Sequence, residues 1–197
     1  MNSNALRILA LIAVLAVIGS AAYLMLQPGT DSSAIGEHET DTSRLQSYDN
    51  PTYGVSFSYP DSYVLTERDE PGLAQQSRHV ITLMDKTAAA NIPENGEGPT
   101  TISIEVFESA AIDSRSVEQW IKNTNATNFN LSPNQTLSQT TVAGVQGLSH
   151  AWDGLYSGES TVIVHKDNML VFSVSFMART DSIRSDFTEL LRTVQLR

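Results

Sequence analysis

The stretch LVFSVSF, from Leu170 to Phe176, places a hydrophobic side chain at every second position, with Ser173 and Ser175 between them. Successive side chains of a strand point to opposite faces, so this pattern predicts a β-strand with one face in the core. The same period of two recurs in TISIEVF, Thr101 to Phe107, and in VSFSY, Val55 to Tyr59. Strands with one hydrophobic face are typical of antiparallel sheets, and the sequence therefore predicts a largely antiparallel sheet with one covered face.

Further strands and turns extend this sheet on both sides. Weaker strand patterns occur at Val64 to Arg68, Val80 to Asp85, Leu137 to Val142, Val145 to Trp152 and Glu159 to His165. Turn-forming pairs are found at Ala143-Gly144, Ser157-Gly158 and Asp167-Asn168. Pro60 cannot donate a ladder hydrogen bond and is expected to end the strand that begins at Val55, while Gly54 allows a close backbone approach before it.

Two segments have a helical period instead. Ser116 and Gln119 form a capping-box pair followed by hydrophobic residues three and four apart, which predicts a helix from Ser116 toward Asn128. The last segment, with Asp181 or Ser182 as N-cap, predicts a C-terminal helix. Its hydrophobic stripe consists of Ile183, Phe187, Leu190, Leu191 and Val194. The order of strands, helix, strands, helix predicts an α+β domain whose helices pack on the sheet.

The N-terminus has a different composition. From Ile8 to Leu26 the chain has no charged residue, and a helix of this length spans the hydrocarbon core of a bilayer, about 30 Å thick. Arg7 precedes this segment and Asp31 is the first charge after it, so the positive-inside rule places the N-terminus in the cytoplasm. The alternative is a signal peptide cleaved after Ala22, where GSAA offers small residues. Both interpretations deliver the rest of the chain across the membrane.

The residues after this segment predict the domain organisation. The segment from Gln27 to Ser47 is rich in Ser, Thr, Gly and acidic residues, which is typical of a flexible polar linker. We therefore expect an N-terminal transmembrane anchor or signal peptide at 1–26, a linker at 27–47 and one globular domain at 48–197. The protein is expected in the cell membrane as a single-pass protein with its C-terminal domain extracytoplasmic.

The composition excludes several classes of function. The 197-residue chain has 22 acidic and 12 basic residues and a net charge of −10. It has no Lys/Arg cluster of the kind that binds phosphate backbones, so no nucleic-acid partner is expected. It also has no cysteine, which excludes disulfides, thiol nucleophiles and cysteine-ligated metals. No cofactor and no metal are expected.

The start of the globular domain has a distinctive arrangement of aromatic residues. A Tyr-Asp-Asn lead-in at Tyr48 precedes YGVSFSYPDSY, in which an aromatic-Gly-apolar strand ends in a proline closely followed by Tyr63. The Ala143-Gly144 hairpin, the strand pair TVIVHKDNMLVFSVSF and the ending FTELLRTVQL continue the pattern. With these features, most of Tyr48 to Arg197 resembles the PsbP-like domain family, although Tyr63 stands where the family usually has Trp.

This resemblance implies an α/β/α sandwich around an antiparallel sheet. It also implies no enzymatic activity as a rule, since characterised relatives are photosystem assembly or stabilisation factors and, more distantly, a nuclear-transport GTPase binder. No metal or partner site is carried over residue by residue.

Candidate catalytic residues are few. GLSHAWDG contains Ser149, His150 and Asp153, but neighbours on a strand point to opposite faces, so Ser149 and His150 cannot form a catalytic pair. An enzyme or metal site would instead require separate strands to bring His79, His150 and His165 together with an acid. We assign no catalytic residue.

The segment AWDGLYSGES is the strongest candidate for recognition. It places the amphipathic rings of Trp152 and Tyr156 beside glycines, a composition typical of recognition loops. In the alternative, Trp152 is a core residue and Tyr156 packs its own loop. We predict that Trp152, Tyr156, His150 and His165 contact a ligand or partner.

Taken together, these features favour a membrane-tethered extracytoplasmic binding or assembly module without catalytic activity, with a protein or envelope component as its partner. The alternative function is an envelope hydrolase or metal-dependent enzyme that uses a cleft of histidine and acidic side chains.

Overall fold

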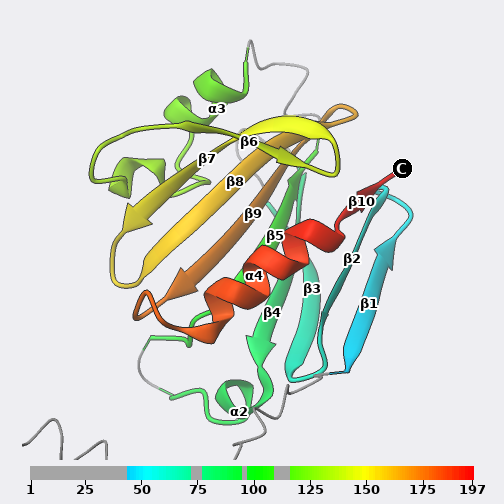
Figure 1. The fold of residues 1–197 in the computed structure, drawn as a ribbon, viewed down its shortest axis with the longest axis vertical. Coiled ribbons are helices and arrows are strands. Elements are labelled where there is room, and N and C mark those ends of the chain that lie inside the picture. The colour runs from blue at the N-terminus through cyan, green and yellow to red at the C-terminus, as the bar shows by residue number, and fades with distance from the viewer. Residues whose placement is uncertain (1–43, 72–76, 95–96, 109–115) are drawn as a thin grey trace, which may run out of the picture. The chain divides into compact units, whose positions relative to one another are not determined.

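The described part of the chain consists of two antiparallel sheets and a few short helices (Figure 1). The computed structural model describes residues 44–71, 77–94, 97–108 and 116–197. The predicted membrane segment Ile8 to Leu26 lies outside these residues. Within the described ranges, no helix is long and apolar enough to cross a bilayer.

The strands form a three-stranded sheet of order β1-β2-β10 and a seven-stranded sheet of order β3-β4-β5-β9-β8-β7-β6. The strands of the small sheet are β1 (Leu45–Asn50), β2 (Val55–Pro60) and β10 (Gln195–Leu196). The strands of the large sheet are β3 (Tyr63–Pro71), β4 (Ser77–Asp85), β5 (Ile102–Phe107), β6 (Ser138–Val142), β7 (Val145–Asp153), β8 (Ser157–His165) and β9 (Asn168–Phe176). The helical elements are α2 (Lys86–Ala89), α3 (Val117–Asn123), η2 (Phe129–Leu131) and α4 (Ser182–Thr193). All the strand pairs in both sheets are antiparallel, as the period of two predicts.

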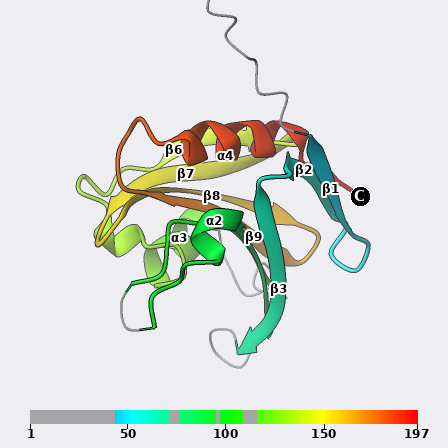
Figure 2. The ribbon, with the colours of Figure 1, turned by 90° about the horizontal axis from the view of Figure 1, so that it is seen from below.

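Helices lie on both faces of the large sheet (Figure 2). The alternation in β9 sends Leu170 and Phe172 into a core shared with α4 and β2. The intervening residues Met169 and Val171 enter a second core with α3 and η2. The expectation of one covered face is therefore wrong for this strand, because Met169 and Val171 are as fully buried as Leu170. The result is the layered arrangement that the family resemblance implies.

Two turn predictions are confirmed by the backbone. Ala143 and Gly144 have φ values of 50° and 81° and join β6 to β7 in a two-residue hairpin, the geometry of a type I′ turn. Gly54 has a φ of 69°, and a Cβ at this position would lie 2.5 Å from the carbonyl oxygen of Arg197. Only glycine allows the C-terminal residue to approach β2 so closely.

Two other turns are misplaced in the sequence prediction. Ser157 and Gly158 both lie inside β8, and the β7–β8 turn is formed by the residues before them, where Gly154 donates to the carbonyl of Tyr156. The turn expected at Asp167-Asn168 lies one residue earlier, because Lys166 adopts a φ of 54° and Asn168 already begins β9.

Several element boundaries also differ from the prediction. The helix that begins at Ser116 ends at Asn123 rather than near Asn128, since Thr124 is extended and Asn128 is left-handed. The C-terminal helix ends at Thr193, because the next residues extend and pair with β2. Strand β1 begins at Leu45, so three residues assigned to the linker pair with β2. The boundaries of β1 and of the C-terminal helix are set by pairing with β2, which local periodicity does not record.

Candidate functional site

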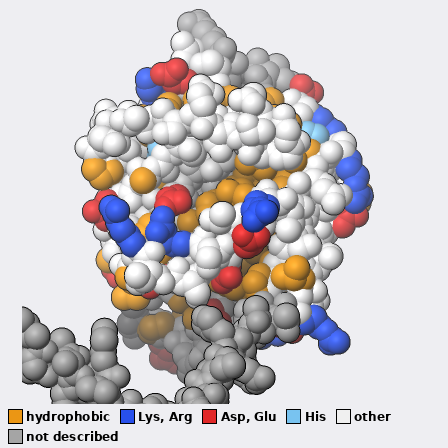
Figure 3. Space-filling model, in the orientation of Figure 1, with side chains coloured by type: hydrophobic (Ala, Val, Ile, Leu, Met, Phe, Trp, Pro, Cys, Tyr) orange, Lys and Arg blue, Asp and Glu red, His pale blue; other side chains and the backbone are white. Residues whose placement is uncertain are grey.

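A groove of about 340 Å³ lies between α4 and strands β6 to β8. Its walls carry hydroxyl and amide groups, and its apolar floor includes Phe187 and Leu191 of α4. Figure 3 shows this face of the molecule, with hydrophobic side chains visible in the middle of a mainly polar surface. The volume is within the usual range of small-ligand sites.

The strand register explains why hydroxyl groups gather in the groove. Ser138 of β6 lies opposite Ser149 of β7, which in turn lies opposite Thr161 of β8. The next two positions of the same row are Phe172 and Ile104, which are buried under the other end of the helix layer. The row therefore changes from hydrophobic to hydroxyl-bearing beyond β9, on which α4 packs, and exposure rises along it from the buried Thr161 through Ser149 to the exposed Ser138.

One end of the groove carries a paired charge. Glu159 lines the groove and forms an ion pair with Arg184 of α4. The Arg184 guanidinium also lies 4.7 Å from the centre of the Phe176 ring, a cation–π contact. Because Glu159 is already neutralised, the groove presents mainly uncharged hydrogen-bonding groups to a ligand.

His150 contributes backbone to this groove, while its ring lies on the opposite face. The ring is buried, its Nε2 lies 2.8 Å from the carbonyl oxygen of Thr127, and it packs edge-on against Phe129. Since a carbonyl only accepts, Nε2 carries the proton and Nδ1 is left as a bare acceptor without a partner among the described residues. Burial lowers the pKa of His150 below its ordinary value, with the bond to Thr127 opposing this effect.

The structure keeps the other histidines apart. His150 lies opposite Ser160, and His165 lies five residues further along β8, which is about 17 Å. The odd spacing also places His165 on the other face, where its Nε2 lies 3.1 Å from the carbonyl oxygen of Arg197. His79, on β4, is engaged by the carboxylates of Asp69 and Glu67. The convergence of histidines that the alternative enzyme or metal site would require is therefore not found, and in the described part of the chain no group of three His, Asp or Glu residues could hold a metal ion.

Trp152 and Tyr156 both hold the β7–β8 turn in place. Trp152 is 9% exposed, and its Nε1 donates to Ser160 Oγ at 3.0 Å. Tyr156 Oη donates to the carbonyl oxygen of Gly98 at 2.7 Å. The exposed side chain of the turn is Leu155. This arrangement agrees with the alternative in which Trp152 is a core residue, and contact of either ring with a partner stays a prediction.

The groove residues were missed by sequence reasoning, although a signal was present. In β7 and β8, Ser149 and Thr161 occupy positions in phase with core residues of their strands, so polar side chains stand where hydrophobic ones are expected. Such a position indicates either a buried hydrogen bond or an uncovered part of the sheet, and only the placement of α4 distinguishes the two.

A second cavity, of about 300 Å³, lies between α2 and the start of α4 and contains Asp85, Asp181 and Asp186. Each of these carboxylates already accepts hydrogen bonds within the domain. Asp85 caps α2, Asp181 accepts from the backbone of the β9–α4 loop, and Asp186 accepts from Tyr63 Oη at 2.7 Å. Burial and this contact raise the pKa of Tyr63. We regard this cavity as part of the structural hydrogen bonding of the domain.

Comparison with known proteins gives a structural likeness only. No protein-family model and no curated protein sequence matches the chain. Among solved structures, the chain is similar to cyanobacterial PsbP (CyanoP) from Synechocystis sp. PCC 6803, with a TM-score of 0.53, 13% sequence identity, and coverage of 81% of this chain and 96% of that one. A crystal structure from Bacteroides thetaiotaomicron matches with a TM-score of 0.48 and 10% identity, covering 77% of this chain and 48% of that one. The likeness to cyanobacterial PsbP shows that this chain has a PsbP-like fold.

Proposed function

We propose that this protein is a membrane-tethered extracytoplasmic binding or assembly module that holds an extended, uncharged segment of a partner protein in the groove between α4 and β6 to β8. The observation that carries the proposal is the row of hydroxyl-bearing residues from Ser138 through Ser149 to Thr161, all of which line the groove. The apolar charge-free segment from Ile8 to Leu26 supports the tether.

The chemistry of the groove favours an uncharged ligand. Hydroxyl and amide groups such as Thr188 and Asn134 both donate and accept hydrogen bonds, whereas the single carboxylate, Glu159, is paired with Arg184. A peptide backbone offers the same alternating donors and acceptors. An ionic ligand would have to break the Glu159–Arg184 pair or remain without a counter-charge.

The edge of the large sheet lies beside the groove. Strand β6 is the last strand in the sheet order, and among the described strands it pairs only with β7. Its sequence, SQTTV, contains neither the Lys nor the Pro residues that commonly block a sheet edge. An extended segment could therefore add to β6 through its backbone while its side chains enter the groove.

The fold and the separation of His150 from His165 support a binding role over the alternative enzyme. His150 and His165 lie on opposite faces of the sheet, so they do not meet in the one cleft that the alternative enzyme requires. The PsbP-like fold is compatible with a binding or assembly module.

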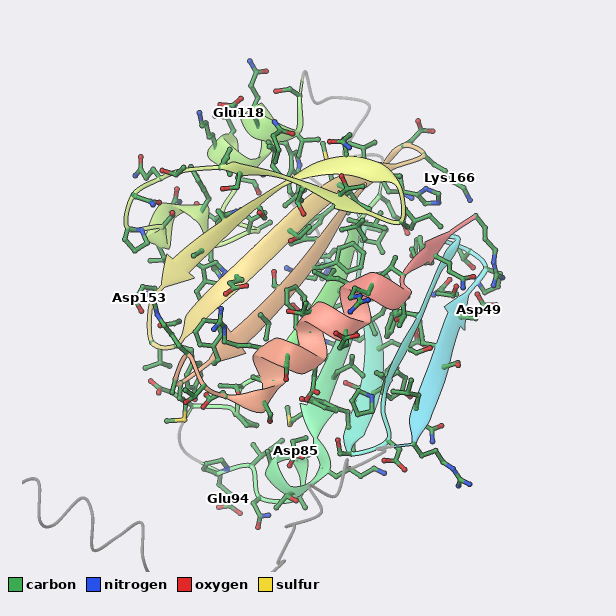
Figure 4. The ribbon with its side chains drawn as sticks, in the orientation of Figure 1. Asp49, Asp85, Glu94, Glu118, Asp153 and Lys166 are labelled. Atoms are coloured by element: carbon green, nitrogen blue, oxygen red, sulfur yellow. The ribbon has the colours of Figure 1, made fainter. Side chains whose placement is uncertain are left out.

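Site-specific photocrosslinking in native membranes tests the proposal. A benzoylphenylalanine residue at Thr188, which lines the groove, is expected to crosslink the full-length protein to a partner. The same residue at the exposed Glu118, on the α3 side of the sheet, is the control (Figure 4). Adding Ser149→Leu, which fills the groove, is expected to abolish the Thr188 crosslink. Equal crosslinking from both positions, or a product that Ser149→Leu leaves unchanged, would show that the groove is not the binding site.

A further inference from the structure

Among the described residues, the large exposed hydrophobic side chains lie at one end of the strands. In the described ranges these residues are Leu45, Ile92, Leu131, Leu155 and Met177, with exposed fractions between 47% and 78%. Single exposed hydrophobic residues are common on soluble domains, so their number alone indicates nothing. Their position in the strand topology is the informative feature.

Three of these residues meet around the β7–β8 turn. Leu155 lies in the turn, and Met177 follows β9 directly after Phe176, the residue that pairs with Ser157 at the start of β8. A Cβ on Gly154 would lie 3.1 Å from Leu131 Cδ1, so Leu131 packs beside the same turn.

The other two residues lie at the same end of the strands. Ile92 belongs to the connection between the end of β4 and the start of β5, and Tyr156 is bonded to Gly98 of that connection. Leu45 pairs with Pro60, where β2 turns into β3. The end of the domain that carries the β7–β8 turn thus also carries these five exposed side chains, four from the large sheet and its connections and Leu45 from the small sheet, and we call it the apolar end.

The opposite end has a different surface. It carries the Ala143-Gly144 turn, the Lys166-Asp167 turn and the C-terminal Arg197. Among the described residues, no large hydrophobic side chain is exposed there. Figure 4 shows Lys166 at this end, away from Asp85 and Glu94 at the apolar end.

The chain also enters the domain at the apolar end. Arg44 is the first described residue, and it accepts a backbone hydrogen bond from Asp61 in the β2–β3 turn. Between Arg44 and the predicted membrane segment lie only residues 27–43. As the flexible polar linker that the sequence predicts, a segment of that length would have an end-to-end distance of about 20–25 Å. With the membrane tether of the proposed function, so short a linker would keep the apolar end near the surface of the bilayer.

We propose that the apolar end rests on the lipid bilayer, with Leu155, Met177 and Ile92 in its interfacial layer. This inference depends on the membrane tether of the proposed function. A few exposed side chains bind a bilayer only weakly, but a short tether supplies an effective concentration in the millimolar range, so weak contacts suffice.

The charges and the groove are compatible with this orientation. The apolar end carries both signs of charge, since Lys86 and Arg179 follow strands β4 and β9 there and Asp85 and Asp153 end β4 and β7, so docking requires no anionic lipid. The groove is lined by α4 and by β6 to β8 and includes none of the five exposed hydrophobic residues, so a partner can occupy it while the apolar end contacts lipid.

The absence of cysteine allows a direct test, because each single-cysteine variant carries one label. The full-length protein is reconstituted in phosphatidylcholine vesicles, with an environment-sensitive fluorophore on Leu155→Cys, on Met177→Cys, or on Asp167→Cys at the opposite end as the control. We expect blue-shifted emission, quenched by lipids with brominated acyl chains, at positions 155 and 177. Position 167 is expected to emit as in water and to be unaffected by brominated lipids.

Each outcome bears on one proposal. Equal emission and quenching at the three positions overturns the docking. A blue shift at position 155 without quenching by brominated lipid also overturns it and assigns the apolar end to protein contacts instead. Retention of the protein in vesicles after an alkaline carbonate wash tests the tether separately. A protein that is retained but whose position 155 remains in water refutes the docking alone, whereas a protein that is washed off refutes the tether.

Discussion

At the scale of single residues, the second core depends on side chains that combine burial with a specific polar contact. His150 and Ser160 are neighbours on β7 and β8, and both lie within hydrogen-bonding distance of the Thr127 carbonyl. Trp152 donates to the same serine. Polar groups buried in this way stabilise a fold only while their partners are kept, since an unpaired buried group costs about 1–3 kcal/mol.

The pH dependence of stability should report on His150. Burial lowers the pKa of the folded ring, while the unfolded ring has its ordinary value of about 6.5. Above a pH of about 6.5 the ring is neutral in both states, and its contribution to the free energy of unfolding is complete. As the pH falls toward the lowered folded pKa, the unfolded state binds the proton more readily, and the free energy of unfolding declines by up to about 1.4 kcal/mol per pH unit.

Urea unfolding at pH 8 and at pH 5.5 measures this effect. The His150→Leu variant lacks the titrating ring, so the stability difference between wild type and variant should change between the two pH values in favour of the variant at pH 5.5. If the stability difference between wild type and His150→Leu is the same at both pH values, the pH dependence does not come from His150.

Gly158 should tolerate no side chain. A Cβ at this position would lie 2.1 Å from Cζ2 of the Trp152 ring, so the indole must move and its bond to Ser160 is strained. We expect Gly158→Ala to lower the free energy of unfolding by about 1–3 kcal/mol. Gly98→Ala is the matched control, because a Cβ there meets no atom within 4 Å. Chemical denaturation with similar midpoints for the two variants would contradict the close approach of Trp152.

At the scale of elements, the β6–β7 hairpin fixes the register that forms the groove. Val142 pairs with Val145 across the turn, and this register brings Ser138 opposite Ser149. A slip of one residue would turn the hydroxyl groups of β6 to the other face of the sheet. The turn residues Ala143 and Gly144 therefore determine which side chains line the groove, although they do not line it themselves.

Substitutions in this turn should change stability in opposite directions. Ala143 has a φ of 50°, which Asn adopts more readily than Ala, so Ala143→Asn is expected to stabilise the domain by about 0.5 kcal/mol. Gly144 has a φ of 81°, and Gly144→Ala is expected to destabilise it by about 1 kcal/mol. Both residues are exposed, so packing does not interfere. Thermal unfolding of the two variants checks the opposite signs, and shifts in the same direction would contradict the turn type.

At the scale of the whole molecule, the central strands join the two cores. Leu170 and Phe172 belong to the core under α4, and Met169 and Val171 belong to the core under α3. Thr193 of α4 also exchanges hydrogen bonds with the backbone of Ser58, which connects the small sheet to the helix. Because the same strands carry both cores, loss of packing in one core would disturb the strands that form the other.

The folded domain should therefore unfold as one cooperative unit. Its two tryptophans, Trp120 and Trp152, lie on the α3 side, whereas far-UV circular dichroism reports the strands and helices of both cores. We expect the urea transitions from tryptophan fluorescence and from circular dichroism to coincide. A tryptophan transition at lower urea would show that the α3 side unfolds independently.

The sequence predicts the parts of this fold that depend on neighbouring residues. The period of two in LVFSVSF predicts β9, and the hydrophobic stripe from Ile183 to Val194 predicts most of α4. The dipeptide Ala143-Gly144 predicts the turn between β6 and β7. These signals are local, because backbone geometry and side-chain direction repeat over a few residues. The resemblance noted in the sequence also leads to the PsbP-like fold that the comparison shows.

Features that depend on distant residues could not be obtained in this way. Short β1 and β10 exist only because β2 lies between them, and Thr124 ends α3 against the helical period. The sequence places His150 beside Ser149, but the pleat sends their side chains to opposite faces.

By itself, therefore, the sequence determined the class of fold, the antiparallel strands, the two main helices and the expectation of a membrane tether. Only the tertiary structure decided that the histidines remain apart, that Trp152 faces inward, and that Ser138, Ser149 and Thr161 form one row beside α4. The physical reason is that side-chain direction is a local property of the backbone, whereas strand partners and the path of a helix across a sheet follow from the packing of the entire core.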